Sequence, residues 1–501
     1  MNNILLVNLW NSIKYFGNYK VHENLGIEYI NAYLNSKGLS SDYYDMNVLD
    51  FEFIEASLKE MSKQYKLIGI SIHENNYSQL KKVTDYLKKL YPESHLMVGG
   101  MFATYYAQEI LTECKSIDSV IRGEGEIAFY NLYKALEEGG NKWKTNLSIA
   151  YMENYSYFEN ELENKFDFRL IKNFERITTH KHKPNRYHIN ATRGCNKNCS
   201  FCSACHFSRL GKGENIRHRD AEDIAEEMIS LYENYYPFSK ICIVDDNFLA
   251  TEACMKRALK LAEIIISKNL YIPFKIDTCI EKVEYNLFSK LKQAGLCEVL
   301  VGIESFSSNS LKVYNKQITA DNITSGLKTL SDLKIHTRMA WIMFHPYITL
   351  EDLIENLDFL ENINLFFYFA DLIGSVRLQK GSSLYDKVKE EGIMIDGMPY
   401  AGWKFKDKLM AIYYNELVTS KFNNLLITAH NKTFYTLREH DQPIRYDKYI
   451  KIRKLFIIYM RNLALYISKN EYLDRSHIDQ EFKGFASNVI KALHELNSIS
   501  S

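Results

Sequence analysis

The sequence lacks several features that mark whole classes of protein. No apolar stretch approaches the roughly 20 residues that a membrane-spanning helix needs, and the best candidate, Leu455–Met460, ends at Arg461. Asn2 and Asn3 lead straight into a short apolar segment, so we expect no secretory signal. The 62 Lys and Arg residues balance 62 Asp and Glu residues. We therefore expect no membrane contact, and we consider a nucleic-acid partner unlikely on electrostatic grounds.

A disulfide framework is also missing. The chain has nine cysteines, of which four lie between residues 195 and 205 while the others are scattered singly. Small secreted domains held by disulfides have a much higher cysteine density. We expect free thiols, and hence a reducing, cytoplasmic location.

The first part of the chain alternates between strand and helix patterns. Apolar strands are expected at 4–7, 42–44, 67–71 and 95–98, with helices at 25–37, 51–64 and 77–90. This pattern predicts a doubly wound α/β domain over residues 1–140, of the flavodoxin or Rossmann type. Ligands of such sheets bind beyond the carboxyl ends of the strands. The loops there are Gly69–Ser71, Gly99–Thr104 and Arg122–Glu126.

A second alternation follows a polar segment, 141–182, that we interpret as an irregular linker. Strands are expected near 187–190, 240–244, 274–277, 298–302, 336–343 and around Phe367, separated by helices at 220–235, 252–268 and 284–294. About six strand–helix units predict a full or partial (β/α) barrel over 183–392, with functional loops at the strand carboxyl ends. Residues 393–501 read as a mainly helical region.

Three cysteines form the most informative pattern of the chain. Cys195, Cys199 and Cys202 have C-x3-C-x2-C spacing, with the aromatic Phe201 directly before the last one. Three thiolates can hold three corners of a cubic iron–sulfur cluster, whereas ferredoxin clusters normally take four protein ligands. The fourth iron is then free to bind a small molecule, so the triplet indicates chemistry rather than electron storage.

Two other interpretations of this segment stay open. Cys205 and His206 could complete a compact zinc site with the triplet. In addition, residues 176–213 carry eight Lys and Arg residues and no Asp or Glu, which could suit nucleic acid. We favour a local explanation, in which these cations compensate the negative charge of a cluster and its thiolates.

The triplet resembles that of radical S-adenosylmethionine (radical SAM) enzymes. In that family the open iron chelates SAM, electron transfer cleaves it to methionine and a 5′-deoxyadenosyl radical, and the aromatic lies near the adenine. Several flanking segments resemble one branch of the family in the right order. They are Arg217–Glu227, Asp245–Phe248, Gly302–Ser305 and Gly381–Tyr385.

The resemblance implies that polar residues at the strand ends contact SAM. The expected cofactor-binding residues are Phe201, Asp246, Gly302, Glu304 and Ser305. The alternative for each carboxylate is a strand-end cap or a salt bridge. Beyond the cluster we assign no catalytic residue.

Two segments depart from the pattern of that branch. The third-strand region often carries an arginine there, but this chain has Cys279 near that place. The usual glycine-rich motif after the fifth strand is replaced by Phe344–Thr349. Both departures could mark a specialised substrate pocket, although Cys279 is more simply a small buried residue.

The N-terminal domain resembles the cobalamin-binding domain fused to some radical SAM barrels. The resemblance covers roughly residues 1–390 and includes the strand-end loops, where small residues let a flat corrin approach the backbone. No D-x-H-x-x-G motif follows the first strand, so that motif offers no histidine to the cobalt. The alternative is a domain that binds no cobalamin, or that binds a flavin or nucleotide. The expected cobalamin-binding residues are Gly69, Ser71, Gly99, Gly100, Thr104, Gly123 and Glu124.

Together the resemblances imply a class B radical SAM methyltransferase-like protein with a four-iron four-sulfur cluster, SAM and cobalamin. The expected reaction is methylation of an unactivated carbon of a small-molecule or peptide natural-product intermediate, with flavodoxin or ferredoxin as reductant. Cobalamin-dependent cyclisation or rearrangement without methyl transfer is the first alternative. A non-catalytic electron-transfer or sensor protein is the second, and a methylthiotransferase acting on RNA is weaker. The substrate and the role of residues 393–501 are not encoded in these motifs.

Overall fold

A computed structural model describes residues 3–9, 23–46, 64–172, 174–177, 184–363, 369–419, 421–439, 443–470 and 473–497. These residues divide into two compact units. The first unit holds residues 1–197, 202–277 and 289–297, and the second holds 198–201, 278–288 and 298–501. Within the described residues, no helix has both the length and the apolar character needed to cross a membrane.

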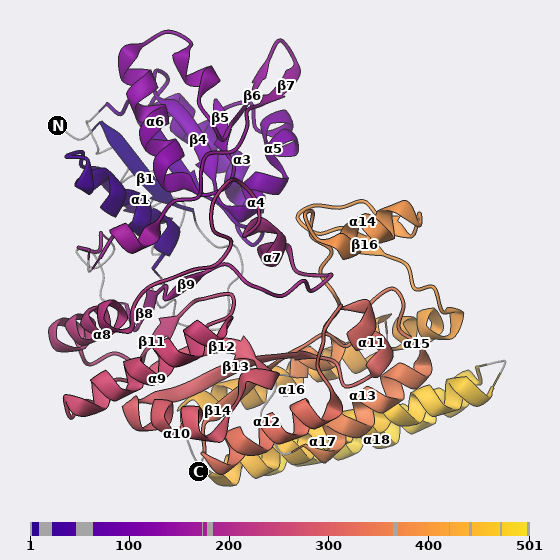
Figure 1. Cartoon of the computed structure of the whole chain (residues 1–501). Helices are drawn as coiled ribbons and strands as arrows, with labels where there is room; N and C mark the ends of the chain where they lie inside the picture. The colour runs from indigo at the N-terminus through magenta and orange to yellow at the C-terminus, as the bar shows by residue number, and fades with distance from the viewer. Residues whose placement is uncertain are drawn as a thin grey trace. The chain divides into compact units, whose positions relative to one another are not determined.

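The first unit begins with a sheet of order β2-β1-β3-β4-β5-β6-β7, in which β1 to β5 pair in parallel. Figure 1 shows this sheet in indigo and purple, with helices packed on it. The strands are β1 (Ile4–Asn8), β2 (Asp42–Asp45), β3 (Leu67–Ser71), β4 (His95–Gly99), β5 (Ser119–Ile121), β6 (Ile149–Glu153) and β7 (Ser156–Glu159). The helices are α1 (Leu25–Ser36), α3 (Tyr77–Leu90), α4 (Met101–Tyr105), α5 (Ala107–Glu113), α6 (Gly125–Glu138) and the 3₁₀ turn η2 (Lys142–Thr145).

The predicted doubly wound domain is confirmed, because apolar strands such as β1 are buried on both faces. Its core joins strand residues such as Leu6 and Met97 to Phe129 and Leu132 of α6. After β1 the chain adds β2 on one side of that strand and then β3 on the other side, so the strand order reverses between β1 and β3. Ligands of doubly wound sheets bind at such a switch point. The expected helix over 51–64 lies almost wholly outside the described residues.

The expectation of an irregular linker over 141–182 is wrong for part of that range. Strands β6 and β7 form an antiparallel hairpin that extends the sheet from β5. The two turn residues, Asn154 and Tyr155, have φ of 48° and 64°. Positive φ at both positions gives the turn that tight hairpins favour. Tyr155 stands where glycine would normally mark such a turn, so the hairpin carries no obvious sequence signal.

The first unit continues with the start of the second alternation. Strand β11 pairs in parallel with β8 and with β12, while the short β9 and β10 form an antiparallel pair. The strands are β8 (Arg186–Ile189), β9 (Thr192–Arg193), β10 (Arg217–His218), β11 (Lys240–Ile243) and β12 (Phe274–Cys279). The helices are η3 (Phe168–Leu170), α7 (Ser203–Phe207), α8 (Ala221–Tyr235), α9 (Glu252–Ser267) and α10 (Tyr285–Ala294), of which residues 285–288 of α10 are assigned to the second unit.

In the second unit, β13 (Leu296–Glu304) pairs in parallel with β14 (His336–Trp341) from Glu298 onward. Five of the six expected barrel strands are therefore strands of the structure. The sixth, around Phe367, lies largely outside the described residues. Nearby, Phe344 and Ser375 form an isolated parallel bridge. The other elements before residue 407 are η4 (Ile280–Lys282), α11 (Ser308–Val313), α12 (Ala320–Asp332), α13 (Leu350–Asn362), η5 (Phe369–Ile373), α14 (Ser383–Glu390), β15 (Met394–Ile395) and β16 (Gly402–Trp403).

The expected helical C-terminal region is confirmed. It consists of α15 (Lys408–Thr419), α16 (Lys421–Glu439), α17 (Pro443–Lys469) and α18 (Arg475–Asn497). Figure 1 shows α17 and α18 in yellow as two long neighbouring helices. Stacked aromatic rings of Phe422, Tyr459 and Phe485 join α16, α17 and α18.

Candidate active site

The cysteine loop leaves the first unit through a short, tightly held strand. Residues Thr192 and Arg193 form β9, which pairs with Arg217 and His218 of β10. Gly194 follows with φ of 96°, and a Cβ there would lie 1.9 Å from the Asn215 carbonyl oxygen. Only glycine fits this position. The backbone before Cys195 is therefore fixed by a strand pair and by close packing against a neighbouring loop.

Ion pairs tie the root of this loop to the start of α6. Arg193 lies 2.7 Å from Glu126, and its guanidinium stacks 4.7 Å from the ring of Tyr29. Arg217 bonds both carboxylate oxygens of Glu124. Burial favours a higher pKa for Glu124, but Arg217 and Arg193 outweigh it and hold this pKa below its ordinary value. Within the first unit, the cluster loop and the loop around Gly123 are thus held together.

This arrangement corrects one expectation. Glu124 was expected to bind cobalamin, yet its oxygens accept bonds from Arg217 and from the backbone N–H of Phe166. A carboxylate engaged by a guanidinium in two places has little capacity left for a ligand. Glu124 is a structural partner of Arg217, which is the first arginine of the family-like segment Arg217–Glu227.

The rest of that segment forms a buried charge network. Arg219 bonds Asp223 at 2.8 Å and also Glu227, and Arg176 bonds Glu227 at 2.5 Å and Glu23 at 2.9 Å. All five side chains are almost fully buried. The network connects the start of α1, the segment before β8 and helix α8. The motif residues therefore fix the framework around the site rather than contact a cofactor.

Removing one member of this network should destabilise the first unit strongly. In Arg176→Met, Glu23 would be left as a buried carboxylate without its cation, which costs about 3–5 kcal/mol. We expect a clear fall in the free energy of unfolding, measured by urea denaturation. The matched control is Arg169→Met, which removes the partly exposed pair with Asp167 and should cost about 0–1 kcal/mol. Equal losses in the two variants would contradict the account.

Two of the three cluster cysteines lie in the first unit and have different environments. Burial raises the pKa of Cys195, and the nearby charges of Asp246 and Cys202 act in the same direction. Cys202 precedes α7, and bonds from the Cys205 side chain and from backbone N–H groups lower its pKa to about 7. A thiol of such pKa is readily available as the thiolate that metals bind.

Asp246 lies near these two cysteines at the end of β11. Its side chain is exposed to water, while the surrounding protein desolvates the carboxyl group enough to raise its pKa. Its neighbour Asp245 is buried and accepts a 2.8 Å bond from the Ala191 N–H. Asp245 is thus a structural carboxylate, whereas contact of Asp246 with SAM stays a prediction.

The tip of the cysteine loop, 198–201, belongs to the second unit. Ser200 donates its N–H to the Tyr314 carbonyl at 3.0 Å and its hydroxyl to the Val313 carbonyl at 2.6 Å. The N–H of Leu384 donates to the Ser200 carbonyl at 2.7 Å. This bond explains the segment Gly381–Tyr385, because it anchors the loop that carries Cys199. Phe201 packs edge-on against Tyr314 with ring centroids 5.3 Å apart.

A buried ion pair lies beside Cys199 in the second unit. The Lys316 ammonium is 2.9 Å from Oε1 of Glu304, and both side chains are less than a tenth exposed. Burial opposes the charge of Lys316, but Glu304, Cys199 and Cys279 outweigh this effect and raise its pKa. Glu304 has φ of 68°, an uncommon value for a non-glycine residue. Gly302 leaves room for the pair, since a Cβ there would lie 2.8 Å from Nζ of Lys316.

Ser305 has a different role from the expected one. Its hydroxyl donates to Oδ1 of Asn356 at 2.9 Å and accepts from the N–H of Ser307 at 3.2 Å. These bonds fasten the end of β13 to α13. Ser305 therefore has a structural role, and its contact with SAM stays a prediction.

The carboxyl edge of the N-terminal sheet places several predicted cobalamin residues together. Gly100 follows β4 with φ of 120°, and a Cβ there would lie 2.5 Å from the Ile72 carbonyl oxygen. The Thr104 hydroxyl donates to the Gly100 carbonyl at 3.0 Å and accepts from the Gly123 N–H at 3.0 Å. Ser71 ends the adjacent strand β3 and accepts a bond from Asn24 at 3.1 Å. These residues form one edge, which we call the corrin edge: Ser71, Gly99, Gly100, Thr104 and Gly123.

Gly69 does not belong to the corrin edge. It lies inside β3, and a Cβ there would be 2.4 Å from the Phe129 ring of α6. Its small size serves helix-on-sheet packing, which explains the glycine without a cofactor, and the expected cofactor contact stays a prediction. By contrast, a Cβ at Gly99 would make only ordinary contacts of 3.6 Å or more, and that position stays open to approach.

Replacing Gly100 tests the corrin edge directly. We expect Gly100→Ala to unfold at a lower temperature, because strained backbone costs about 1–3 kcal/mol and the new methyl meets the Ile72 carbonyl. We also expect it to retain less than half the corrin of the native protein after gel filtration, read by absorbance. The control is Gly139→Ala, where φ is 82° but nothing lies within 4 Å of the new Cβ. Full corrin retention by Gly100→Ala would remove this loop from the site.

The two departures from the family pattern lie in the second unit. Cys279 is half-buried and close enough to raise the pKa of Lys316. His345 is buried, its Nε2 is 3.0 Å from the Ser310 hydroxyl, and burial lowers its pKa to about 4. A neutral, buried imidazole of this kind is a packing residue. The sequence departure at 344–349 therefore brings a structural histidine rather than a new acid or base.

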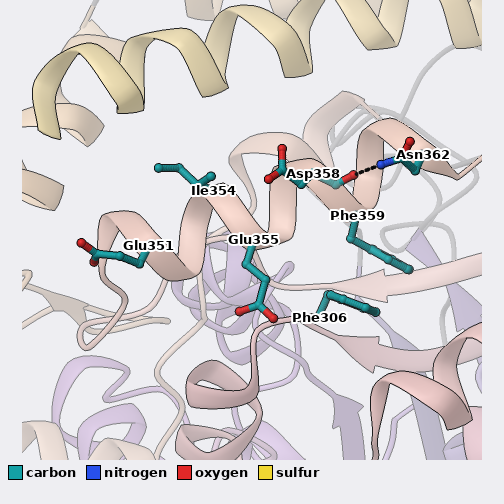
Figure 2. Close-up of a pocket in the computed structure, with 7 residues that line it drawn as sticks. All are labelled: Phe306, Glu351, Ile354, Glu355, Asp358, Phe359 and Asn362. Atoms are coloured by element: carbon teal, nitrogen blue, oxygen red, sulfur yellow. Dashed lines mark hydrogen bonds between the residues drawn. The ribbon is translucent and has the colours of Figure 1, made fainter. Parts of the chain in front are cut away.

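A pocket lies on α13 of the second unit (Figure 2). Its volume is about 590 Å³, and Figure 2 shows Glu355 directed toward Phe306 while Phe306 stacks on Phe359, with ring centroids 4.2 Å apart. None of the predicted site residues lines it. Its lining residues are Phe306, Glu351, Ile354, Glu355, Asp358, Phe359 and Asn362.

Known protein families match the two predicted domains. The model of the radical SAM superfamily matches residues 189–360, and that of the B12-binding domain matches residues 19–133. The chain is a cobalamin-binding radical SAM protein. The matched ranges include the cysteine loop, Asp246, Lys316 and the corrin edge.

Relatives of this radical SAM protein have several activities. An uncharacterized methyltransferase, PH0819, of Pyrococcus horikoshii is 26% identical over 346 residues, which cover 67% of this chain and 73% of the relative. An anaerobic magnesium-protoporphyrin IX monomethyl ester cyclase of Synechocystis is 23% identical and covers 74% of both chains.

Solved structures of radical SAM proteins share the fold. The cobalamin-dependent SAM radical enzyme OxsB, solved with aqua-cobalamin and SAM, has a TM-score of 0.76 and 18% identity, covering 99% of this chain and 79% of its own. The radical SAM methyltransferase TsrM of Kitasatospora setae has a TM-score of 0.65 and 15% identity, covering 80% of each chain.

The cofactors of this radical SAM protein are a four-iron four-sulfur cluster, SAM and cobalamin. The donor chemistry fits the cluster, since three half-buried cysteines that form no disulfide lie within eight residues. The corrin edge, where Gly99 leaves its side of the backbone open to approach, fits a flat macrocycle. Among the described residues, no three His, Cys, Asp or Glu side chains gather as ligands of one metal ion. The three cysteine ligands of a cubane cluster each bind a different iron atom, so they need not gather around one ion. The cysteine triplet itself is what fits the cluster.

Sequence reasoning missed Lys316. No motif marks this residue, which lies twelve positions after Glu304. The chain returns to Glu304 because Asn315, with φ of 52°, reverses its direction after α11. A lysine following an asparagine at a helix end is too common a pattern to indicate a site, so only the fold reveals the pair.

Proposed function

We propose that this chain is a cobalamin-dependent radical SAM methyltransferase that methylates an unactivated carbon of a small-molecule or peptide substrate. When bound, the cluster and SAM supply a hydrogen-abstracting radical, and cobalamin supplies the methyl group. The residues of the chain bind and orient the cluster, SAM and cobalamin and provide charges complementary to theirs. No general base is required for hydrogen abstraction, which suits a site where the buried His345 is neutral.

One observation carries the proposal. Arg193 and Arg217 lie on the strands that root the cysteine loop and pair with Glu126 and Glu124. These two carboxylates lie within three residues of Gly123 of the corrin edge. The root of the cysteine loop and the corrin edge are thus tied together within the first unit, which supports a function that uses both cofactors.

The Lys316–Glu304 pair supports binding of SAM. The amino-acid end of SAM carries an ammonium and a carboxylate, and the pair offers the complementary charges. Lys316 has three N–H donors, of which one serves Glu304, and Glu304 accepts through Oε1 only. We infer that Lys316 orients the SAM carboxylate beside Cys199 and that Glu304 accepts from the polar groups of SAM. Contact of Asp246 with SAM stays a prediction.

The electron donor is proposed to be a flavodoxin or ferredoxin, because the reaction consumes an external reductant. None of the nine cysteines, all of them among the described residues, forms a disulfide, which supports a reducing, cytoplasmic setting for the proposal.

A second candidate is cyclisation or rearrangement without methyl transfer. It is favoured by one observation, the similarity to a protoporphyrin ester cyclase over three quarters of both chains. The structural features above serve both reactions equally, because they hold the cofactors and do not define the product.

The ratio of the products formed from SAM distinguishes methyl transfer from cyclisation or rearrangement. Each methylation consumes one SAM as methyl donor, leaving S-adenosylhomocysteine, and a second SAM as radical source, leaving 5′-deoxyadenosine and methionine. We expect the two nucleosides in equal amounts when reconstituted protein, reductant and substrate candidates are combined under anaerobic conditions. With SAM carrying a deuterated methyl group, the label should appear in the product. Steady formation of deoxyadenosine with no S-adenosylhomocysteine would favour cyclisation and refute methyl transfer.

A further inference from the structure

Tyr105 connects two parts of the first unit that carry different cofactors. It is the last residue of α4, the short helix that begins directly after Gly100 of the corrin edge. Its hydroxyl donates to the Ser203 carbonyl at 3.2 Å. Ser203 directly follows the cluster ligand Cys202 and begins α7. A side chain from the corrin edge thus reaches the backbone of the cysteine loop.

The surroundings of Tyr105 keep its hydroxyl protonated, so that it can donate a hydrogen bond. Its ring meets Phe207 of α7 edge-on, with centroids 6.5 Å apart. Burial raises the pKa of its phenol, and the nearby Cys205 and Cys202 add to this effect. The hydroxyl therefore keeps its proton. It bonds the carbonyl of Ser203, the residue directly after the cluster ligand Cys202. Hydrogen-bond donors and dipoles around cluster ligands influence the potential of an iron–sulfur cluster.

The other end of α4 is held just as firmly. Thr104 bonds the Gly100 carbonyl and the Gly123 N–H. Phe102 stacks on Tyr106 with centroids 4.6 Å apart, so the single turn of α4 is packed on both sides of Tyr105. A change of backbone at Gly99 or Gly100 therefore moves Tyr105 with it, since α4 has only five residues.

We propose that Tyr105 is a positioning residue that couples occupancy of the corrin edge to the electronic state of the cluster, through its bond to the Ser203 carbonyl. The inference rests on the proposed function only for the presence of both cofactors. The coupling is reciprocal: if bound corrin shifts the potential of the cluster, then the redox state of the cluster changes the affinity for corrin by the same free energy. It gives the enzyme a way to reduce its cluster preferentially when the corrin is in place.

The test uses the reconstituted full chain, with hydroxocobalamin added or withheld, and two variants. Tyr105→Phe removes the donor and keeps the ring. Tyr65→Phe is the control, because it removes a hydroxyl bonded to Asp42 at 3.0 Å near the opposite, amino edge of the same sheet. The first readout is the midpoint potential and EPR spectrum of the cluster. The second is hydrogen exchange of peptides covering 202–208, with and without corrin, in protein lacking the cluster.

We expect corrin to shift the cluster potential and slow exchange of 202–208 in the native protein and in Tyr65→Phe. In Tyr105→Phe, corrin should bind with affinity within about threefold of native, while both corrin effects fall by at least half. Equal corrin effects in Tyr105→Phe and native protein would overturn the proposal, as would no corrin effect in the native protein. Failure of the native protein to bind corrin would instead refute the proposed function. If Tyr105→Phe cannot hold its cluster, hydrogen exchange of residues 202–208 in cluster-free protein still tests the proposal.

Discussion

Cys199→Ala is expected to abolish SAM cleavage. Cys199 lies at the tip of the loop, whose backbone is fixed by Ser200 bonds to Val313 and Tyr314, so the residue cannot be replaced by a neighbouring thiol without rebuilding the tip. Mutation of a residue that only hydrogen-bonds a metal ligand typically lowers metal affinity or activity by about 10–100-fold. Loss of a direct ligand should exceed this, so deoxyadenosine formation should fall by more than about 100-fold and iron content with it.

The control for this change is Cys297→Ala. Cys297 is a half-buried thiol whose Sγ donates to the Phe274 carbonyl at 3.2 Å. We expect its iron content and deoxyadenosine yield to stay within about twofold of native, since it lies outside the triplet. Iron analysis and product chromatography under anaerobic conditions provide both readouts. A full cluster in Cys199→Ala, or equal losses in both variants, would contradict the assignment of the triplet.

Lys316→Met should weaken SAM binding while leaving the cluster in place. The change removes a buried ammonium that faces Glu304 and leaves the cysteine ligands untouched. Truncating one partner of a buried charge pair typically costs about 2–5 kcal/mol in binding. We expect the Kd for SAM to rise by at least about 30-fold, which corresponds to roughly 2 kcal/mol. Equilibrium binding to the reconstituted, cobalamin-loaded protein measures it.

Two further variants make this result specific. Lys312→Met removes an exposed lysine from α11, the same helix that precedes Lys316, and should bind SAM normally. The double variant Glu304→Gln with Lys316→Met removes both charges, which restores stability without restoring the SAM carboxylate partner. We expect its Kd for SAM to stay high. Native affinity in Lys316→Met with a full cluster would rule out this lysine as a SAM contact.

The sequence predicted the features that depend on local pattern. Buried strands such as β1 and helices such as α9 are marked by unbroken apolar runs or by a clear helical period, and both formed close to the expected bounds. Gly100 was predicted from a motif and proved to need its positive φ. Asp246 was expected at a strand end and lies there, exposed, near two cluster cysteines.

What the sequence did not reveal depends on partners far along the chain. Glu124 looked available until Arg217, 93 residues later, proved to occupy both its oxygens. Gly69 resembled the other strand-end glycines, but the Phe129 ring explains its size. Ser305 is held by Asn356, and Lys316 is drawn to Glu304 by a turn after α11. Each of these depends on tertiary packing, which no short window of sequence contains.

The most direct test of the central claim is anaerobic reconstitution of the native chain with iron, sulfide and hydroxocobalamin, followed by incubation with SAM and a reductant. We predict close to one corrin and four irons per chain, and formation of 5′-deoxyadenosine that depends on the reductant. Intact SAM in the presence of a full cluster and bound corrin, even with candidate substrates added, would contradict an enzymatic role and point instead to electron transfer or sensing.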